Sequence, residues 1–216
     1  MENKNTLLEI RDACSSREEL DRRISDLMDT VGLASRFANS YPHELDGGRR
    51  QRIGIARALA LDPEFIVCDE PVSALDVSIQ AQILNLMQDL QEERGFTYLF
   101  ITHDMSVVKH ISNHIIVMYL GHMVEKAEAD ALFERTLHPY SKALLSAIHE
   151  PNIHSTRERM ILRGEITSPI DPPEGCRFAA RCAYAQEACF KKTPVLEEVL
   201  PNHFVACHRT REVNKL

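Results

Sequence analysis

FIVCDEPVSALD, residues 65–76, contains a short apolar run that ends in two carboxylates, Asp69 and Glu70. A run of this kind is typical of a strand buried on both faces of a parallel sheet, and ligands bind beyond the carboxyl ends of such strands. Hydrolysis of a Mg²⁺-bound nucleotide uses one carboxylate to order the hydrated ion and another to polarise the attacking water. For an isolated pair, the simpler interpretation is that solvent begins where the strand ends.

Two more apolar runs follow this stretch. TYLFIT (residues 97–102) ends beside His103, and HIIVMYL (residues 114–120) follows a segment with helical spacing. Strands that alternate with helices predict a parallel α/β sheet with right-handed crossovers. His103 would then lie at the same sheet edge as the carboxylates, in reach of a γ-phosphate or the attacking water. A lone histidine at a strand end is, however, more often a surface or packed residue.

The loop LDGGRRQR, residues 45–52, precedes a segment with the composition of a well-packed helix. Its two glycines allow backbone N–H groups to approach an anion closely at the positive end of a helix dipole. The alternative is an ordinary helix whose first turn is capped by Asp46. Taken without their context, the two interpretations are equal.

The composition limits the classes of function. The chain has 216 residues, of which 44% are hydrophobic and 26% charged, which suffices for one core and a small appended module. Its formal net charge of -7 argues against a broad nucleic-acid footprint. No apolar run approaches the ~20 residues of a membrane span, and the N-terminus has no secretory pattern. We expect a cytoplasmic protein whose membrane role comes through a partner.

Taken together and in order, these motifs closely resemble those of the ABC-transporter ATPase family. LDGGRRQR is similar to the signature loop, FIVCDEP to the second nucleotide motif, SALD (73–76) to the dimer-contact loop and FITHD (100–104) to the histidine switch. The resemblance implies that Asp69 helps to order Mg²⁺, Glu70 is the catalytic base and His103 senses the γ-phosphate. The residues it places around Mg²⁺ and ATP in a dimer are Asp46, Gly47, Gly48, Arg49, Gln51, Asp69, Ser73 and Asp76.

Two residues of the signature loop depart from the family. Asp46 stands where a serine is usual, and its carboxylate would repel the γ-phosphate. Arg49 replaces the usual glutamine and offsets that repulsion, unless Asp46 turns inward as a helix cap and leaves the amides to bind phosphate. We expect the contact across the dimer to be weakened rather than abolished.

None of the eight glycines belongs to a G-x-x-x-x-G-K-[ST] phosphate loop. In the family this loop, an adenine-stacking aromatic residue and a Mg²⁺-contacting glutamine precede the region that Met1 begins. The resemblance therefore implies a C-terminal portion that starts inside the helical subdomain. Without the backbone cradle and its lysine, we expect the chain alone neither to bind ATP tightly nor to hydrolyse it. Apolar faces of its sheet are expected to be exposed.

The tail holds Cys176, Cys182, Cys189 and Cys207, in a spacing that differs from the paired C-x2-C of common zinc folds. Stable disulfides are disfavoured in the cytoplasm, so ligation of an iron–sulfur cluster or zinc is the better explanation, with small apolar fillers as the alternative. The tail is similar to the C-terminal extension of oligopeptide and dipeptide importer ATPases. That resemblance implies a [4Fe–4S] cluster first and zinc second.

The expected fold is a partial ABC-type nucleotide-binding domain of class α/β, with a parallel sheet, flanking helices, part of the helical subdomain and a small irregular cysteine-rich extension. Its expected parts are 1–60 with the signature loop, 61–137 with the ATPase core half, and 138–216. The expected function is ATP hydrolysis for peptide import, in a truncated form that is inactive alone. The alternative is a non-catalytic partner that offers its signature loop to a complete ATPase.

The resemblance also implies the partners and the location. They are a second ATPase subunit, two membrane permease subunits and indirectly a peptide-binding protein, without nucleic acid. The chain would lie on the inner face of the cell membrane, held there by the permease subunits.

Overall fold

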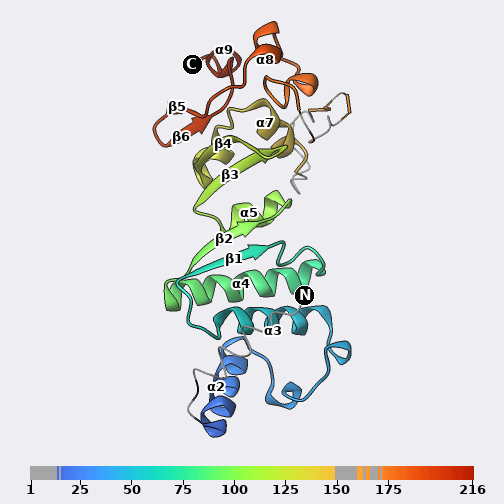
Figure 1. Cartoon of the computed structure of the whole chain (residues 1–216), viewed down its shortest axis with the longest axis vertical. Coiled ribbons are helices and arrows are strands. Elements are labelled where there is room, and N and C mark those ends of the chain that lie inside the picture. Colours follow the sequence, from blue (N-terminus) through green and yellow to red (C-terminus); the bar gives the residue numbers. More distant parts are fainter. Residues whose placement is uncertain (1–13, 15, 149–159, 163, 166–169, 171) are drawn as a thin grey trace, which may run out of the picture. The chain divides into compact units, whose positions relative to one another are not determined.

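The computed structural model describes residues 14, 16–148, 160–162, 164–165, 170 and 172–216. The chain divides into two compact units, and the boundary falls between His103 and Asp104 (Figure 1). The three-part division at residues 60 and 137 stays a prediction. Among the described residues, no helix is both long and apolar enough to cross a membrane.

In the described residues, the N-terminal unit consists of helices and one pair of strands. Its elements are α2 (Arg17–Thr30), η1 (Ser35–Phe37), η2 (Pro42–Glu44), α3 (Gly47–Leu59), β1 (Phe65–Asp69), α4 (Val77–Arg94) and β2 (Thr97–Ile101). Ser16 starts α2 by accepting a hydrogen bond from the backbone N–H of Glu19, and Gly95 ends α4 in the left-handed conformation that glycine adopts without cost.

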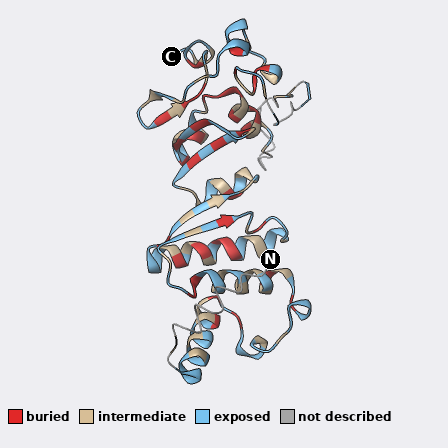
Figure 2. Cartoon of the chain, viewed as in Figure 1, coloured by how far each residue is buried: buried red, intermediate tan, exposed pale blue. Residues whose placement is uncertain are grey.

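Strands β1 and β2 are parallel, and Val67 is paired with Leu99 in their register. Side chains alternate between two faces of a strand. Ile66 and Tyr98 point to the face that packs on the core of this unit, and the odd-numbered residues of both strands are exposed on the other (Figure 2). The core comes from three helices and adjoining loops, and its buried residues are Met28, Val31, Leu33, Leu59, Leu90 and Phe96.

The C-terminal unit contains a second, antiparallel sheet in the order β3-β4-β6-β5. Its elements are α5 (Met105–Ile111), β3 (His114–Tyr119), β4 (His122–Glu128), α6 (Ala129–Glu134), α7 (Pro139–Ser146), η3 (Ala179–Arg181), α8 (Glu187–Lys191), β5 (Glu197–Leu200), β6 (His203–Val205) and α9 (Thr210–Asn214). Phe178, which is 2% exposed, attaches the cysteine-bearing segment to this unit through ring contacts with Tyr119 and Tyr140.

Two features of this unit correct the sequence-based fold. The predicted strand at residues 114–120 belongs to the antiparallel sheet and not to the parallel one, because Leu120 and Gly121 turn the chain back with φ values of 45° and 78°. Positive φ at both central residues is the geometry of a two-residue hairpin. The tail is also more regular than expected, since β5 and β6 extend the same sheet.

Candidate functional site

The carboxyl ends of β1 and β2 bring the predicted catalytic pair together. Nδ1 of His103 lies 3.0 Å from Oε1 of Glu70, and both side chains are exposed to solvent. The backbone N–H of Glu70 donates to the carbonyl of Ile101 at 2.9 Å, which continues the pairing of Asp69 with Ile101 beyond the strand. Parallel strands in this register place their polar ends at one edge, as the sequence predicts.

Glu70 has an unusual backbone conformation. Its φ is +46°, in the left-handed region that residues other than glycine rarely adopt. The loop that follows supports it, because the Ser73 hydroxyl donates to the Glu70 carbonyl at 3.1 Å. Strain of this kind costs on the order of 1 kcal/mol or more and is concentrated at functional sites.

The signature loop carries an internal charge pair. One oxygen of Asp46 accepts a hydrogen bond from the backbone N–H of Arg49 at 2.8 Å, and the other lies 2.7 Å from the Arg49 guanidinium. That guanidinium stands over the ring of Phe37, with its carbon 4.6 Å from the ring centroid. The structure therefore gives Asp46 the capping role, with Arg49 against it. Gln51 lies half-buried in the first turns of α3.

The two glycines of this loop are needed for packing within the unit. A Cβ on Gly48 would lie 2.7 Å from a methyl group of Ile79, and one on Gly47 would lie 3.1 Å from a methyl group of Leu75. The signature loop thus packs directly on the SALD segment and the first turn of α4. Asp76 caps α4 by accepting from the Ile79 N–H at 3.0 Å.

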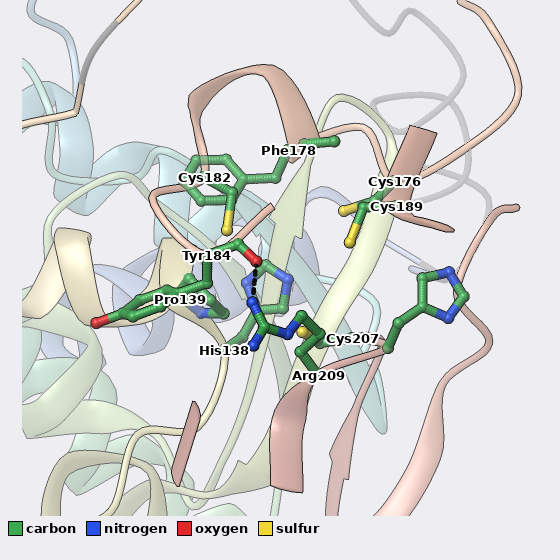
Figure 3. A pocket seen from close by; sticks show the side chains of 11 residues that line it. His138, Pro139, Cys176, Phe178, Cys182, Tyr184, Cys189, Cys207 and Arg209 are labelled. Carbon is green, nitrogen blue, oxygen red and sulfur yellow. Dashed lines mark hydrogen bonds between the residues drawn. The ribbon is translucent and has the colours of Figure 1, made fainter. Parts of the chain in front are cut away.

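The four tail cysteines line one small cavity of about 20 Å³ in the C-terminal unit, together with His138 and Arg209 (Figure 3). All four are free thiols. Burial raises the pKa of Cys176 to about 11 and also raises that of Cys182, so both are protonated at neutral pH. In the part of the chain that the structure describes, no group of three or more His, Cys, Asp or Glu side chains is arranged to hold a metal ion.

A buried polar cluster lies beside this cavity, and none of its residues was predicted from the sequence. The Glu125 carboxyl group is fully buried and accepts hydrogen bonds from the backbone N–H groups of Leu137 and His138, at 2.7 and 3.0 Å. Nε2 of His203 lies 2.7 Å from the same carboxyl group. The local signal is that Glu125 is two residues from the buried Ala127, at an inward position of β4.

The pH dependence of stability should show the burial of His138. Its pKa is lowered to about 4 by burial, against an opposing effect of Glu125, and its Nδ1 accepts from the Tyr140 N–H at 3.1 Å. In the unfolded chain the His138 imidazole takes up a proton near pH 6.5, whereas in the folded chain it stays neutral until about pH 4. The free energy of unfolding that this burial allows above pH 6.5 is therefore lost as the pH falls toward 4. The loss is on the order of 3 kcal/mol.

His138→Asn retains a capping side chain but does not titrate. In urea unfolding of both proteins at pH 7, 5.5 and 4.5, we expect the variant to lose less stability than the parent. Equal losses would contradict a neutral buried imidazole.

The parallel pair has Asp69, Glu70 and His103 at its end, and a capped helix that starts at a double glycine belongs to the same unit. This combination is typical of the class of ABC-type ATP-binding proteins. The fold resembles that of the dimeric MJ0796 cassette, described as a bacterial ABC transporter cassette, with a TM-score of 0.51 and 34% identity over 58% of this chain and 55% of that one. CbiO1 from Clostridium perfringens shares the fold, with a TM-score of 0.54 and 23% identity over 60% of this chain and 51% of that one.

Two family models match the chain, and they support membership of the ABC class and indicate a family within it. The ABC transporter model matches residues 1–73, and the model of the oligopeptide/dipeptide transporter C-terminal region matches residues 124–189. The putative oligopeptide transport ATP-binding protein YkfD of Bacillus subtilis is 56% identical over 87% of this chain and 58% of its own length. OppF of Escherichia coli, an oligopeptide transport ATP-binding protein, is 52% identical over 89% of this chain and 58% of its own.

The chain belongs to the oligopeptide/dipeptide family of ABC transporter ATP-binding proteins. It spans between 58% and 63% of the length of the curated relatives it matches.

Proposed function

We propose that this chain contributes the hydrolytic carboxylate, the switch histidine and the signature loop to an ATPase that powers peptide import. The observation that carries the proposal is the 3.0 Å contact between Glu70 and His103 at the ends of paired parallel strands. The names of the relatives, which include oligopeptide transport and peptide import ATP-binding proteins, support peptides as the transported class.

Each residue at the edge has a separate task in this proposal. Asp69 is exposed at the end of β1, where its oxygens suit a hydrated Mg²⁺. Glu70 accepts a hydrogen bond from the attacking water. The hydrogen bond that its backbone N–H donates to the Ile101 carbonyl fixes the position of its backbone. His103 holds the Glu70 carboxylate from the neighbouring strand. Bound Mg²⁺ would supply charge neutralisation on the phosphates.

The phosphates of ATP need a cradle that this sequence does not contain, since no glycine pattern fits a phosphate loop. We propose that the chain alone does not hold ATP tightly, and that it works in a dimer with a second ATPase subunit. That dimer would lie on the inner face of the membrane, against two permease subunits served by a peptide-binding protein.

The test is ATP turnover by the purified chain, alone and mixed with E. coli OppF as a complete subunit. We expect background turnover alone and a stimulated rate on mixing. Glu70→Gln should reduce the stimulated part at least about tenfold, because general-base catalysis contributes on the order of 10²-fold or more. The matched control is Glu92→Gln, an exposed glutamate on α4 that should leave the rate unchanged.

Two results would change the proposal. Stimulation that survives Glu70→Gln would mean that the chain acts as a non-catalytic partner and supplies only its signature loop. No stimulation, with soluble and folded components, would reject an ATPase role in either form.

The four tail cysteines are our proposed ligands for a [4Fe–4S] cluster, with zinc as the second choice. All four line one cavity, and thiolates suit both groups. Arg209 lies at this cavity, where its guanidinium donates to the Tyr184 carbonyl at 2.8 Å and to the Glu212 carboxylate at 2.7 Å, so Glu212 and bound thiolates would share its positive charge. Because burial raises the pKa of Cys176 and Cys182, loading must displace protons and should weaken as pH falls.

Metal analysis of anaerobically purified protein decides between these choices. Iron and acid-labile sulfide in equal amounts, with visible absorbance, would support the cluster. Zinc alone would support the second choice, and neither metal would leave the cysteines as small apolar residues of the tail.

A further inference from the structure

Three segments line the cysteine cavity of the C-terminal unit. They are the start of α7, the cysteine-bearing segment at residues 172–192, and a short stretch that we call the clasp, residues 207–214, which runs from Cys207 to the end of α9. The cavity measures about 20 Å³, which is the space of roughly one water molecule. A larger group that the thiols bind can therefore enter only when one of the three segments moves.

Two of these segments are anchored by buried contacts. Phe178, which is 2% exposed, holds the cysteine-bearing segment through ring contacts with Tyr119, Tyr140 and His138. The start of α7 is held by the fully buried Glu125 carboxyl group, which accepts hydrogen bonds from two backbone N–H groups there. Segments anchored in a core open only at a free energy close to that of global unfolding.

The clasp is held by polar contacts near the surface. Of its residues, all of which the structure describes, only Thr210 is buried, and none belongs to the apolar core of this unit. The Arg209 guanidinium donates to the Tyr184 carbonyl at 2.8 Å (Figure 3), and Nε2 of His208 lies 2.7 Å from the Lys192 carbonyl. Few apolar contacts and exposed hydrogen bonds are features of elements that open locally. The clasp is therefore the side of the cavity that opens most easily.

Asn214 joins the clasp to α7. Its Nδ2 donates to the Leu137 carbonyl at 3.0 Å, and its Oδ1 accepts from Nζ of Lys142 at 2.5 Å. The same Nδ2 donates to the Thr210 carbonyl at 2.8 Å, inside α9. The Leu137 N–H in turn donates to the buried Glu125 carboxyl group. One amide side chain thus connects the end of α9 to the anchored start of α7.

The antiparallel sheet sets the limit of any motion of the clasp. Val205 of β6 is 1% exposed, and the Ala206 N–H donates to the Val124 carbonyl at 2.9 Å. Cys207 is the first residue beyond these contacts. Its carbonyl accepts from the Thr210 hydroxyl at 3.1 Å, within the clasp. When the clasp moves, Cys207 consequently moves with it and away from the other three thiols.

We propose that the clasp is the gate of the cysteine cavity, and that Asn214 is the positioning residue that keeps it closed. The clasp opens while the rest of the C-terminal unit stays folded, which admits a group to the thiols and brings Cys207 back when it closes. The inference deepens the proposed ligand role of the cysteines and rests on that role for what enters. The opening itself rests on the contacts of the clasp.

The test is the rate at which the thiols of the metal-free, folded chain react with N-ethylmaleimide, followed for each cysteine by mass spectrometry. In Asn214→Ala we expect Cys176 and Cys189, which lie outside the clasp, to react at least about tenfold faster than in the parent, because two hydrogen bonds to α7 are lost. Alanine favours a helix more than asparagine does, so weakened helix propensity would not explain this result. Arg211→Ala, at an exposed position of α9, is the matched control and should react like the parent.

Urea separates opening of the clasp from unfolding of the whole unit. A local opening exposes little surface, so the thiol rates should rise much less steeply with urea than the equilibrium constant of global unfolding does. Lys142→Met is a milder variant, because it removes one contact of Asn214 and leaves the bond to the Leu137 carbonyl. It should give rates between those of the parent and Asn214→Ala.

Three results would overturn the gate: unchanged thiol rates in Asn214→Ala and Lys142→Met, equal acceleration in Arg211→Ala, or a urea dependence as steep as that of global unfolding. The ligand role is tested separately, by uptake of Zn²⁺ and by assembly of a cluster from ferrous iron and sulfide in the same metal-free protein. Expected thiol rates without either kind of loading would keep the gate and count against the ligand role. Loading with unchanged thiol rates would do the opposite.

Discussion

Glu125→Ala is expected to lower the free energy of unfolding of the C-terminal unit by about 4 kcal/mol. The Glu125 carboxyl group is the hydrogen-bond partner of two backbone N–H groups at the start of α7, and it contacts His203 of β6. Alanine would leave all three polar groups buried without this partner. Each such group costs about 1–3 kcal/mol.

Chemical unfolding at pH 7, followed by far-UV circular dichroism, measures this effect. The matched control is Glu128→Ala, which removes an exposed glutamate from the end of the same strand and should change stability by less than about 0.5 kcal/mol. Glu125→Gln keeps one acceptor oxygen and should fall between the two. An alanine variant as stable as its control would show that the carboxyl group does not hold these elements together.

Gly175→Ala is expected to disrupt the cysteine-bearing segment, at a cost of about 3 kcal/mol or more from overpacking and backbone strain. A Cβ at this position would lie 2.7 Å from the Cys189 carbonyl oxygen and 2.9 Å from backbone atoms of Phe190. Backbone atoms cannot rotate away as a side chain does. Gly175 also has a φ of +114°, which other residues rarely adopt.

The same contact joins two candidate ligands, because the Cys176 N–H donates to the Cys189 carbonyl at 2.7 Å. We therefore expect the buried Cys189 thiol to react faster with a thiol reagent in Gly175→Ala than in the parent, as followed by mass spectrometry. Gly164→Ala is the matched control: its φ is +80°, but its nearest neighbour, the Ala180 carbonyl oxygen, is at 3.7 Å. It shares the backbone strain without the clash. Equal behaviour of the two variants would contradict a steric role for Gly175.

Several elements of the N-terminal unit could be predicted from sequence because their signals are local. The apolar run predicts the strand at residues 65–69, and helical spacing predicts α4. The rule that parallel strands end at one edge predicts that Glu70 and His103 lie close together. The sequence predicts the capping role of Asp46 only as one of two alternatives. The choice depends on where the Arg49 side chain goes, and a loop sequence does not determine that.

The C-terminal unit was harder because its contacts join distant residues. His203 is 78 residues from Glu125, and local periodicity contains no information on that pair. Residues 114–120 look like another parallel strand, and only the turn at Leu120 and Gly121 reveals a hairpin. The grouping of four cysteines was predicted, but their arrangement around one cavity depends on Phe178 packing against two tyrosines.

At Glu70, the left-handed backbone conformation lowers the stability of the fold at the position of the proposed catalytic carboxylate. Glycine adopts that conformation at little cost, so replacement by glycine would relieve the strain there while removing the carboxylate. Under the proposed function, a lineage that no longer needed hydrolysis would gain stability by making this change. Glutamate at this position is then a compromise in which the chain keeps the proposed catalytic carboxylate at the expense of its own stability.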